Sequence, residues 1–385
     1  MNLTRQQHRI LEAGAEIFAD RPTSEDTAWM ARQLVQATLP HSDPGDVPAW
    51  SRTNGHLTLT ISPAWEFNQE AGKHISSGIP YGTIPRLLLF WVTTEAIRLQ
   101  SRRIELGNSL SEFMRELDIV PTGGRWGTIT RLREQMNCLF KARISFEYSD
   151  DKRDAWLNMD IAPKGELWWD YKNPENACLF SSWIQLGEDF YSAIVGAPVP
   201  VDMRALKALR KSPLALDLYA WATYTAFNVN KSEKERSVSW ELLHQQFGSD
   251  YNRIDNFQAK AKSAFKKIKV VYQDLNLTFV KGGIKILPST TAVLPKRTTK
   301  AKRMASQKQA EISLSKPSVP SAEREDFISS KAYEKAKQLV LDAGTDWDIR
   351  ELERQFHAYA DKKGRPSSPD RAFLGFVKKK VQNCP

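Results

Sequence analysis

Residues 129–140, ITRLREQMNCLF, and residues 254–265, IDNFQAKAKSAF, carry the same apolar pattern. In each stretch five apolar residues follow at spacings of three, four, three and one, which places them on one stripe of an α-helix. Basic and polar residues fill most other positions. The apolar residues are Ile129, Leu132, Met136, Leu139 and Phe140, and then Ile254, Phe257, Ala261, Ala264 and Phe265. The pattern indicates a duplicated helical unit with a polar outer face.

The first copy of the repeat runs from Pro85 to about Ile161. Pro85 is placed like a proline at the first position of a helix. Ser109 and Glu112 predict a capping box at the start of the next helix. The expected elements are helices over Leu87–Ile97, Leu110–Leu117 and Trp126–Phe140 and strands over Ile104–Leu106, Ile144–Tyr148 and Ala155–Ile161.

The second copy runs from about Met203 to Leu287 and repeats these signals. Pro213 starts an apolar helix, Ser239 is the expected cap of the next one, and Gly248 is its expected end. The remaining expected elements are a helix over Arg253–Lys269 and a hairpin of Leu277–Val280 and Ile284–Leu287. Helix, short strand, helix, turn, helix and hairpin is the order of a winged helix, a variant of the helix-turn-helix.

The fold class expected from these patterns is mainly α with small β-hairpins (α+β). Residues up to about 40, including Ile10, Trp29 and Leu34, are expected to be helical, and His56–Ile61 to be a strand. We expect five regions: an N-terminal extension (1–80), winged-helix domain 1 (81–165), winged-helix domain 2 with a lead-in (166–288), a basic flexible linker (289–328) and a C-terminal helical module (329–385). The linker contains KRTTKAKR at 296–303, which is more typical of a solvated tether than of a specific contact.

The composition favours a polyanionic partner. The chain has 385 residues, a net charge of +10, 41% hydrophobic residues and 12 tryptophans, enough for folded cores. Cys138, Cys178 and Cys384 are too few for a disulfide framework and lack the spacing of metal ligands, which fits a reducing cytoplasm. The N-terminus has no secretion signal, and the longest apolar run, Leu87–Val92, is too short to span a bilayer. Double-stranded nucleic acid is therefore preferred over a membrane.

Side chains opposite the apolar stripes are the candidate DNA contacts. Arginine pairs with guanine and asparagine with adenine in the major groove, whereas flanking lysines suit phosphates. In the second repeat the candidates are Asn256, Lys260, Lys262, Ser263, Lys266 and Lys267, with Lys281 and Lys285 on the hairpin. In the first repeat this side presents Arg131, Glu134, Cys138 and Lys141, with Arg125 and Trp126 at the start. For either helix alone, a merely solvated basic face is an equally good interpretation.

The sequence contains no recognisable catalytic, metal or cofactor site. It lacks GxxxxGK[ST], so a P-loop ATPase is not expected, and it lacks the His-x-His pair of a metal-dependent nickase. His56 and His74 have no partner at metal spacing. Asp150–Asp151 and Glu188–Asp189 are expected in solvated turns. Trp168 and Trp169 could stack on bases, although paired tryptophans are more often core residues.

Four stretches resemble the plasmid-encoded RepA replication initiators: PYGTIPRLLLFWVTTEA (80–96), ELGNSLSEFMRELDI (105–119), TGG (122–124) and ITRLREQMNCLF (129–140). The resemblance continues more diffusely to about Pro288. It implies binding to directly repeated sites at a plasmid origin, opening of the duplex, and recruitment of the host initiator and replicative helicase. It also implies that the protein represses its own gene as a homodimer and initiates replication as a monomer.

By the same resemblance, the DNA-reading positions are Arg125, Trp126, Thr128 and Arg131 in the first unit and Asn256, Lys260, Ser263 and Lys267 in the second. The tail after residue 288 looks similar to small helical modules of other replication proteins. A transcriptional repressor without a replication role would need the same DNA-reading helices, and a primase or nickase is the enzymatic alternative.

Overall fold

The computed structural model describes residues 4–151, 153–248, 250–293, 330–342, 352–353, 355–356 and 369–382. The chain divides into a compact unit of residues 1–296 and a second unit of residues 297–385. Helices and strands are mixed, which confirms the α+β class. Residues 294–328 of the predicted linker, KRTTKAKR included, lie outside the described residues.

The N-terminal residues form one long helix followed by strands. Helix α1 begins at a capping box, in which Thr4 accepts from the Gln7 N–H and the Gln7 side chain reaches back to the Thr4 N–H. The helix predicted at Trp29 is wrong, because Trp29 lies in a strand paired with residues 198–202. The elements are α1 (Arg5–Ala19), β1 (Thr27–Ala31), α2 (Arg32–Gln36), β2 (Trp50–Asn54), β3 (Leu57–Ser62), β4 (Trp65–Asn68) and β5 (Lys73–Ser76).

The first repeat follows the predicted order of elements. Pro85 stands at the third position of its helix, two residues later than predicted, where its missing N–H is still harmless. Ser109 accepts a hydrogen bond from the Glu112 N–H, as expected of the cap. The third helix starts at Thr128, so Trp126 precedes it. The elements are α3 (Thr83–Leu99), β6 (Arg103–Gly107), α4 (Leu110–Glu116), α5 (Thr128–Lys141), β7 (Arg143–Asp150) and β8 (Arg153–Asp160).

The second repeat contains the same series of elements. Pro213 is the first residue of its helix, and Ser239 caps the next by accepting from the Leu242 N–H. Gly248 is the C-cap. The elements are α8 (Pro213–Ser232), β12 (Arg236–Ser239), α9 (Trp240–Phe247), α10 (Ile254–Val271), β13 (Leu277–Val280) and β14 (Gly283–Ile286).

A lead-in segment joins the two repeats. The turn predicted at Glu188–Asp189 is wrong, because both carboxylates lie in the first turn of a helix, where its dipole favours negative charge. The elements of this segment are β9 (Lys164–Glu166), β10 (Ser182–Gln185), α6 (Glu188–Gly196), β11 (Pro198–Asp202) and α7 (Met203–Leu209).

The strands of the two repeats have different partners. In the second repeat β12 pairs with β14, which pairs with β13, so the strand before α9 joins the hairpin after α10. In the first repeat the hairpin β7–β8 continues a sheet ordered β2-β3-β7-β8, and β6 pairs instead with β10. Two smaller pairs, β1–β11 and β4–β5, are separate.

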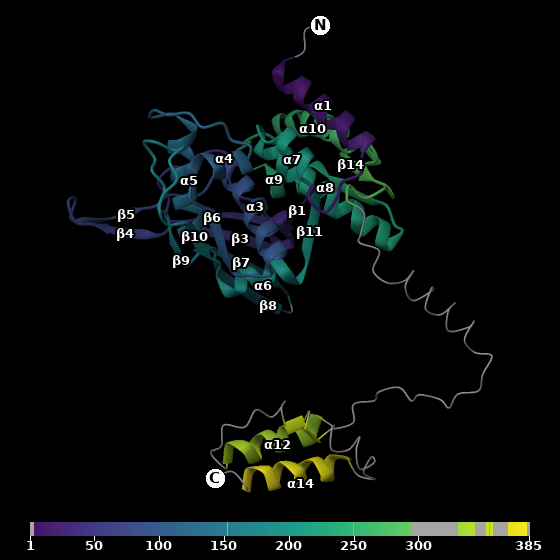
Figure 1. Cartoon of the computed structure of the whole chain (residues 1–385). Helices are drawn as coiled ribbons and strands as arrows, with labels where there is room; N and C mark the ends of the chain where they lie inside the picture. The colour runs from purple at the N-terminus through teal and green to yellow at the C-terminus, as the bar shows by residue number, and fades with distance from the viewer. Residues whose placement is uncertain are drawn as a thin grey trace. The chain divides into compact units, whose positions relative to one another are not determined.

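A continuous hydrophobic core extends from Ile10 to Ile286. The helices and strands that enclose it are labelled in Figure 1. Strand pairing crosses both predicted boundaries, since β3–β7 joins residues on either side of residue 80 and β6–β10 joins residues on either side of residue 165. The two predicted winged-helix domains therefore share one hydrophobic core in residues 10–286. The domain boundaries at residues 80 and 165 stay a prediction.

A buried ion pair connects the first helices of the two repeats. Arg86 of α3 donates to both carboxylate oxygens of Asp217 of α8 at 2.8 Å, and His41 Nε2 lies 2.9 Å from the same carboxylate. Arg86 also donates to the backbone oxygens of Leu39, Pro40 and Gly82. Burial alone raises the pKa of Asp217, but Arg86 and His41 outweigh it and lower the pKa below the ordinary value.

The C-terminal unit has a small core of its own. Helices α12 (Ser330–Asp342) and α14 (Pro369–Gln382) pack together, with Phe356 placed 5.3 Å from the ring of Phe373. The buried residues include Ala336, Val340, Leu352, Phe356 and Phe373 from the three predicted faces, with Ala372 and Phe376 packed against them. Tyr359 and the side chain of Tyr333 lie outside the described residues.

Candidate nucleic-acid interface

Helix α10 buries its apolar stripe and leaves its lysines at the surface. Phe257, Ala261, Ala264 and Phe265 are buried as predicted, whereas Ile254 is only half-buried. The helix contains five lysines and one acidic residue, Asp255, whose carboxylate pairs with Arg253. The candidates Asn256, Lys260, Lys262, Ser263 and Lys266 are exposed, and Lys267 is half-buried.

The α10 lysines occupy two sides of the helix. Lys262, Lys266 and Lys269 follow at helical spacing and lie toward the hairpin, since Lys269 donates to the Leu277 carbonyl at 3.3 Å. The Lys262 ammonium lies 5.5 Å above the Trp240 ring of α9, a cation–π contact that fixes its position. Lys260 and Lys267 lie on the other side of the wheel.

The hairpin adds two basic residues of different character. Lys281 is exposed in the turn beside Gly282, which takes a positive φ of 82°. Lys285 of β14 is half-buried and pairs with Glu235 at 2.7 Å, so its charge is partly neutralised. Of the two, Lys281 is better placed to meet a phosphate.

Helix α1 packs along the C-terminal half of α10 (Figure 1). Gly14 is close enough to Val270 that a β-carbon there would lie 2.5 Å from the Val270 carbonyl oxygen. Gln273 also donates to the Gly14 carbonyl at 3.4 Å. The sequence did not reveal this neighbour. Val270 is half-buried at this contact, whereas Lys262 and Lys266, on the hairpin side of α10, are exposed.

In the first repeat, the residues before α5 form an exposed aromatic and basic pair. The Arg125 guanidinium lies 5.2 Å above the ring of Trp126, which is 81% exposed. Thr128, by contrast, is held in the loop: it exchanges hydrogen bonds with Thr122, and its hydroxyl donates to the Val120 carbonyl at 2.7 Å. Its hydroxyl is therefore a component of the loop that positions α5.

The outer face of α5 is less basic than that of α10. Arg131 is exposed, but Lys141 forms an ion pair with Glu66 of β4. The expectation that Cys138 lies on this outer side is wrong, because its thiol is buried and donates to the Ser77 carbonyl at 2.8 Å. Burial raises the pKa of this thiol to about 11, so Cys138 is a structural residue.

The residues considered for metal binding or base stacking do not form a common site among the described residues. Within the part of the chain that the structure describes, no group of His, Cys, Asp or Glu could hold a metal ion. His56 contacts the Ser149 carbonyl, and His74 packs on Phe67. The two neighbouring tryptophans lie in different environments. Trp169 is buried, whereas Trp168 is exposed and lies against Phe180.

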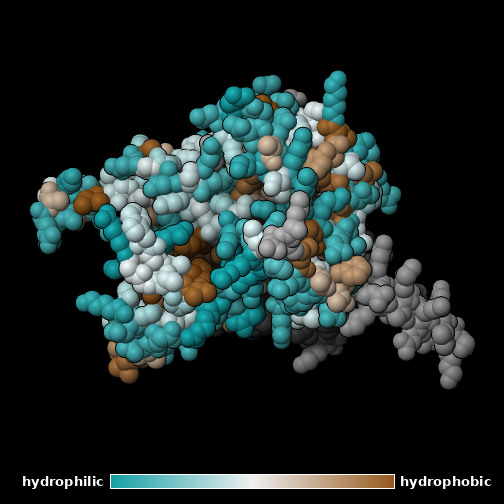
Figure 2. All heavy atoms as spheres, turned by 90° about the horizontal axis from the view of Figure 1, so that it is seen from above, coloured by the Kyte–Doolittle hydropathy of each residue, from teal (hydrophilic) through white to brown (hydrophobic). Residues whose placement is uncertain are grey.

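Figure 2 views the molecule from the side of α1 and α10 and shows hydrophilic residues over most of that face, with scattered apolar patches. Among the described residues, no helix combines the length and apolar character needed to cross a bilayer.

Comparison with solved structures finds domains 2 and 3 of RctB. One crystal structure, of selenomethionine derivatives, is 9% identical with a TM-score of 0.40, and the match covers 64% of this chain and 93% of that chain. A second is 6% identical with a TM-score of 0.38 and coverages of 67% and 97%. Both scores are below 0.5, so neither carries an argument about function.

Comparison by sequence finds the family. No curated protein matches the chain. Residues 79–242 match the family described as plasmid encoded RepA protein, a range that begins before α3 and extends into α9. The match includes all four stretches that carried the resemblance, so it confirms the resemblance to the plasmid-encoded RepA family over these residues.

Proposed function

We propose that this protein initiates plasmid replication by binding directly repeated origin sites through two winged-helix units. The second repeat supplies the observation that carries the proposal. Its strand β12 pairs with the hairpin β13–β14. We expect this pairing of a winged helix, in which α10 would be the recognition helix. The basic side chains of α10 are on the surface and its apolar stripe is in the core.

Within this unit, α10 would enter the major groove. Asn256 near its N-terminus suits a base edge, because N-terminal residues of a recognition helix approach bases most closely. Lys260, Lys262, Lys266 and Lys267 would contact phosphates on either side, and Lys281 would reach the backbone from the hairpin. Phosphate contacts of this kind give affinity that falls with salt.

The first unit would make a second contact of a different kind. Arg125 and Trp126 project from the start of α5, and Arg131 follows on its exposed face. Arginine can recognise guanine, and an exposed tryptophan can pack on sugar or base. Two units in tandem would cover about two helical turns of DNA.

Initiation would draw on binding energy to bend and unstack the origin, without nucleotide hydrolysis or a cofactor. The proposal includes a cytoplasmic location and contacts with the host initiator and replicative helicase. It also includes a homodimer that represses the protein's own gene. The match to the RepA family supports these partners.

A plasmid-maintenance assay tests the proposal. DNA flanking the gene is cloned beside a selectable marker on a plasmid that has no other origin, and the protein is supplied from a second plasmid. Maintenance with the natural sequence, and its loss with Lys262→Ala/Lys266→Ala, is the expected result. Repression of a reporter without plasmid maintenance would favour the repressor. Nicking of supercoiled origin DNA by the purified protein with magnesium would favour an enzyme.

A further inference from the structure

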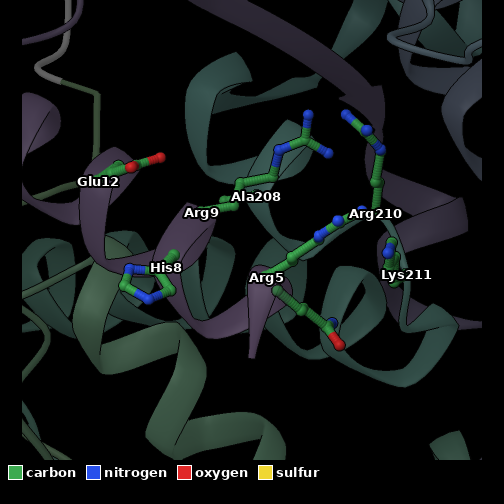
Figure 3. Close-up of a pocket in the computed structure, with 8 residues that line it drawn as sticks. Arg5, His8, Arg9, Glu12, Ala208, Arg210 and Lys211 are labelled. Atoms are coloured by element: carbon green, nitrogen blue, oxygen red, sulfur yellow. The ribbon is translucent and has the colours of Figure 1, made fainter. Parts of the chain in front are cut away.

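A pocket of about 580 Å³ lies where the N-terminal turns of α1 meet the end of α7. Its lining comes from two segments that are far apart in sequence. The residues are Arg5, Gln6, His8, Arg9, Glu12, Ala208, Arg210 and Lys211. Figure 3 shows the side chains of Arg5, Arg9 and Arg210 gathered on one side of it, with Glu12 farther away.

The pocket is strongly basic. Three arginines and one lysine line it against a single carboxylate, Glu12. Asp118, which follows α4, contacts Arg210 and lies 4.0 Å from Arg9, so one carboxylate is shared by two guanidinium groups. The Arg210 side chain is only 13% exposed. Burial and the charge of Arg9 lower the pKa of Arg210 to about 10.

The helix dipoles favour two of the four cations in the pocket and disfavour the other two. Arg210 and Lys211 follow the C-terminal end of α7, where the helix dipole favours positive charge. Arg5 is the first residue of α1, and Arg9 stands one turn later, at the end where the dipole disfavours cations. The first turn of α1 contains no acidic residue. Arg5 and Arg9 thus face the pocket at a cost to the helix, which an anion in the pocket would offset.

We propose that this pocket binds a phosphate group of the DNA backbone, outside the two recognition helices. The inference rests on the proposed function and adds a third contact to it. Helix α1, whose N-terminal turns line the pocket, packs on both α7 and α10. Guanidinium groups bind phosphate oxygens in a bidentate manner, and several converging donors hold one phosphate firmly.

The test compares two double variants of the full chain. Arg5→Gln/Arg9→Gln removes two cations from the pocket, and Lys172→Gln/Lys207→Gln removes two exposed lysines outside it. Affinity is measured by fluorescence anisotropy with a labelled random-sequence duplex of about 30 base pairs, roughly three helical turns, over a series of salt concentrations. A random sequence suffices, because phosphate contacts do not depend on the bases.

The pocket variant should bind about tenfold more weakly than the control variant at moderate salt, since it cannot make the charge-assisted hydrogen bonds of the two guanidinium groups. Its plot of log affinity against log salt should be shallower by about 0.9 for each phosphate that the variant no longer neutralises. Equal affinity and equal slope in the two variants would overturn the inference. Arg5→Lys/Arg9→Lys, which keeps the charges, should restore the slope and guards against a folding defect.

A second arm distinguishes DNA phosphate from free nucleotide. Melting temperatures of the wild type and the pocket variant are measured with ATP and with inorganic phosphate. Stabilisation of the wild type alone by ATP, with unchanged duplex affinity of the variant, would overturn the assignment to DNA. Wild-type protein that fails to bind any duplex would overturn the proposed function as well, whereas normal binding by the variant would overturn the pocket alone.

Discussion

The two repeats share their helices and differ in what surrounds them. In the second repeat the hairpin after α10 pairs with the repeat's own strand, β12. In the first repeat the hairpin after α5 pairs with β3, and the corresponding strand, β6, pairs with β10. The same helical framework thus supports a self-contained sheet in one copy and a sheet shared with the N-terminal segment in the other.

The third helices of the two repeats, α5 and α10, differ in charge as well. Helix α10 has five lysines against one acidic residue, and α1 covers part of its C-terminal half. Helix α5 exposes Arg131 next to Glu134, and Lys141 is paired with Glu66. Under the proposed function, we expect the second repeat to supply most of the salt-dependent affinity for DNA and the first repeat to supply a smaller, more selective contact.

The largest effect on stability is expected at the buried ion pair of Arg86 and Asp217, which joins the two repeats. Asp217→Ala leaves the Arg86 guanidinium buried without its carboxylate, which should lower the free energy of unfolding by about 3–5 kcal/mol. Urea denaturation measures the change, with Arg98→Ala at an exposed pair as the control, for which about 0.5 kcal/mol or less is expected. Equal effects of the two substitutions would show that the repeats are not joined through this pair.

The same pair predicts a loss of stability in acid. The pKa of Asp217 in the folded protein lies below its ordinary value, so its contribution is complete above the unfolded-state pKa of about 3.9. The contribution disappears as pH falls through the lower, folded-state pKa. The unfolding free energy of Asp217→Asn should therefore depend less on pH than that of the wild type below about pH 4.

Core substitutions compare the two apolar stripes. Phe257→Ala in α10 should lower the free energy of unfolding by about 3–5 kcal/mol and Leu132→Ala in α5 by about 2–5 kcal/mol, because both side chains are fully buried. Calorimetry or urea titration would measure both. A change below about 1 kcal/mol for either, which is typical of a surface position, would mean that its helix is turned the other way.

Surface substitutions compare the outer faces. Arg131→Ala and Lys267→Ala should leave stability within about 0.5 kcal/mol and weaken origin binding by about 1–3 kcal/mol. Arg131→Ala should have the larger effect on discrimination between sites, since α10 retains further lysines. Gel-shift titrations with specific and scrambled duplexes measure this. A uniform loss for Arg131→Ala on both duplexes would identify it as a phosphate contact.

The helix caps give the smallest difference. Ser109→Ala and Ser239→Ala should each cost about 1 kcal/mol, because each hydroxyl accepts a backbone N–H at a helix start. Ser109 should cost more, since it is buried and also donates to the Pro174 carbonyl at 3.1 Å. Equal melting temperatures of the two variants would contradict this ranking.

Periodicity and caps were enough to predict the helices of both repeats. Ser109, Ser239 and Pro213 act locally, so their roles can be inferred from neighbouring residues. Strand partners could not be predicted, because β3–β7 and β6–β10 join residues far apart in the chain. Trp29 has helical spacing, but pairing with β11 determines its structure.

For the candidate interface too, the sequence predicted positions within one helix but not contacts between distant residues. The exposed lysines of α10 follow from the helical wheel alone. The helical wheel could not show that Ser77 covers Cys138, that Glu66 pairs with Lys141, or that Thr122 engages the Thr128 hydroxyl. The basic pocket was missed because its residues come from α1 and α7.

A nuclease-protection footprint on the DNA that flanks the gene tests the central claim most directly. The wild type should protect repeated sites of about two helical turns each, with Arg131→Ala losing protection in one half of each site and Lys262→Ala/Lys266→Ala in the other. Protection that both variants retain in full, or that both lose evenly over the whole site, would contradict the assignment of one groove to each repeat.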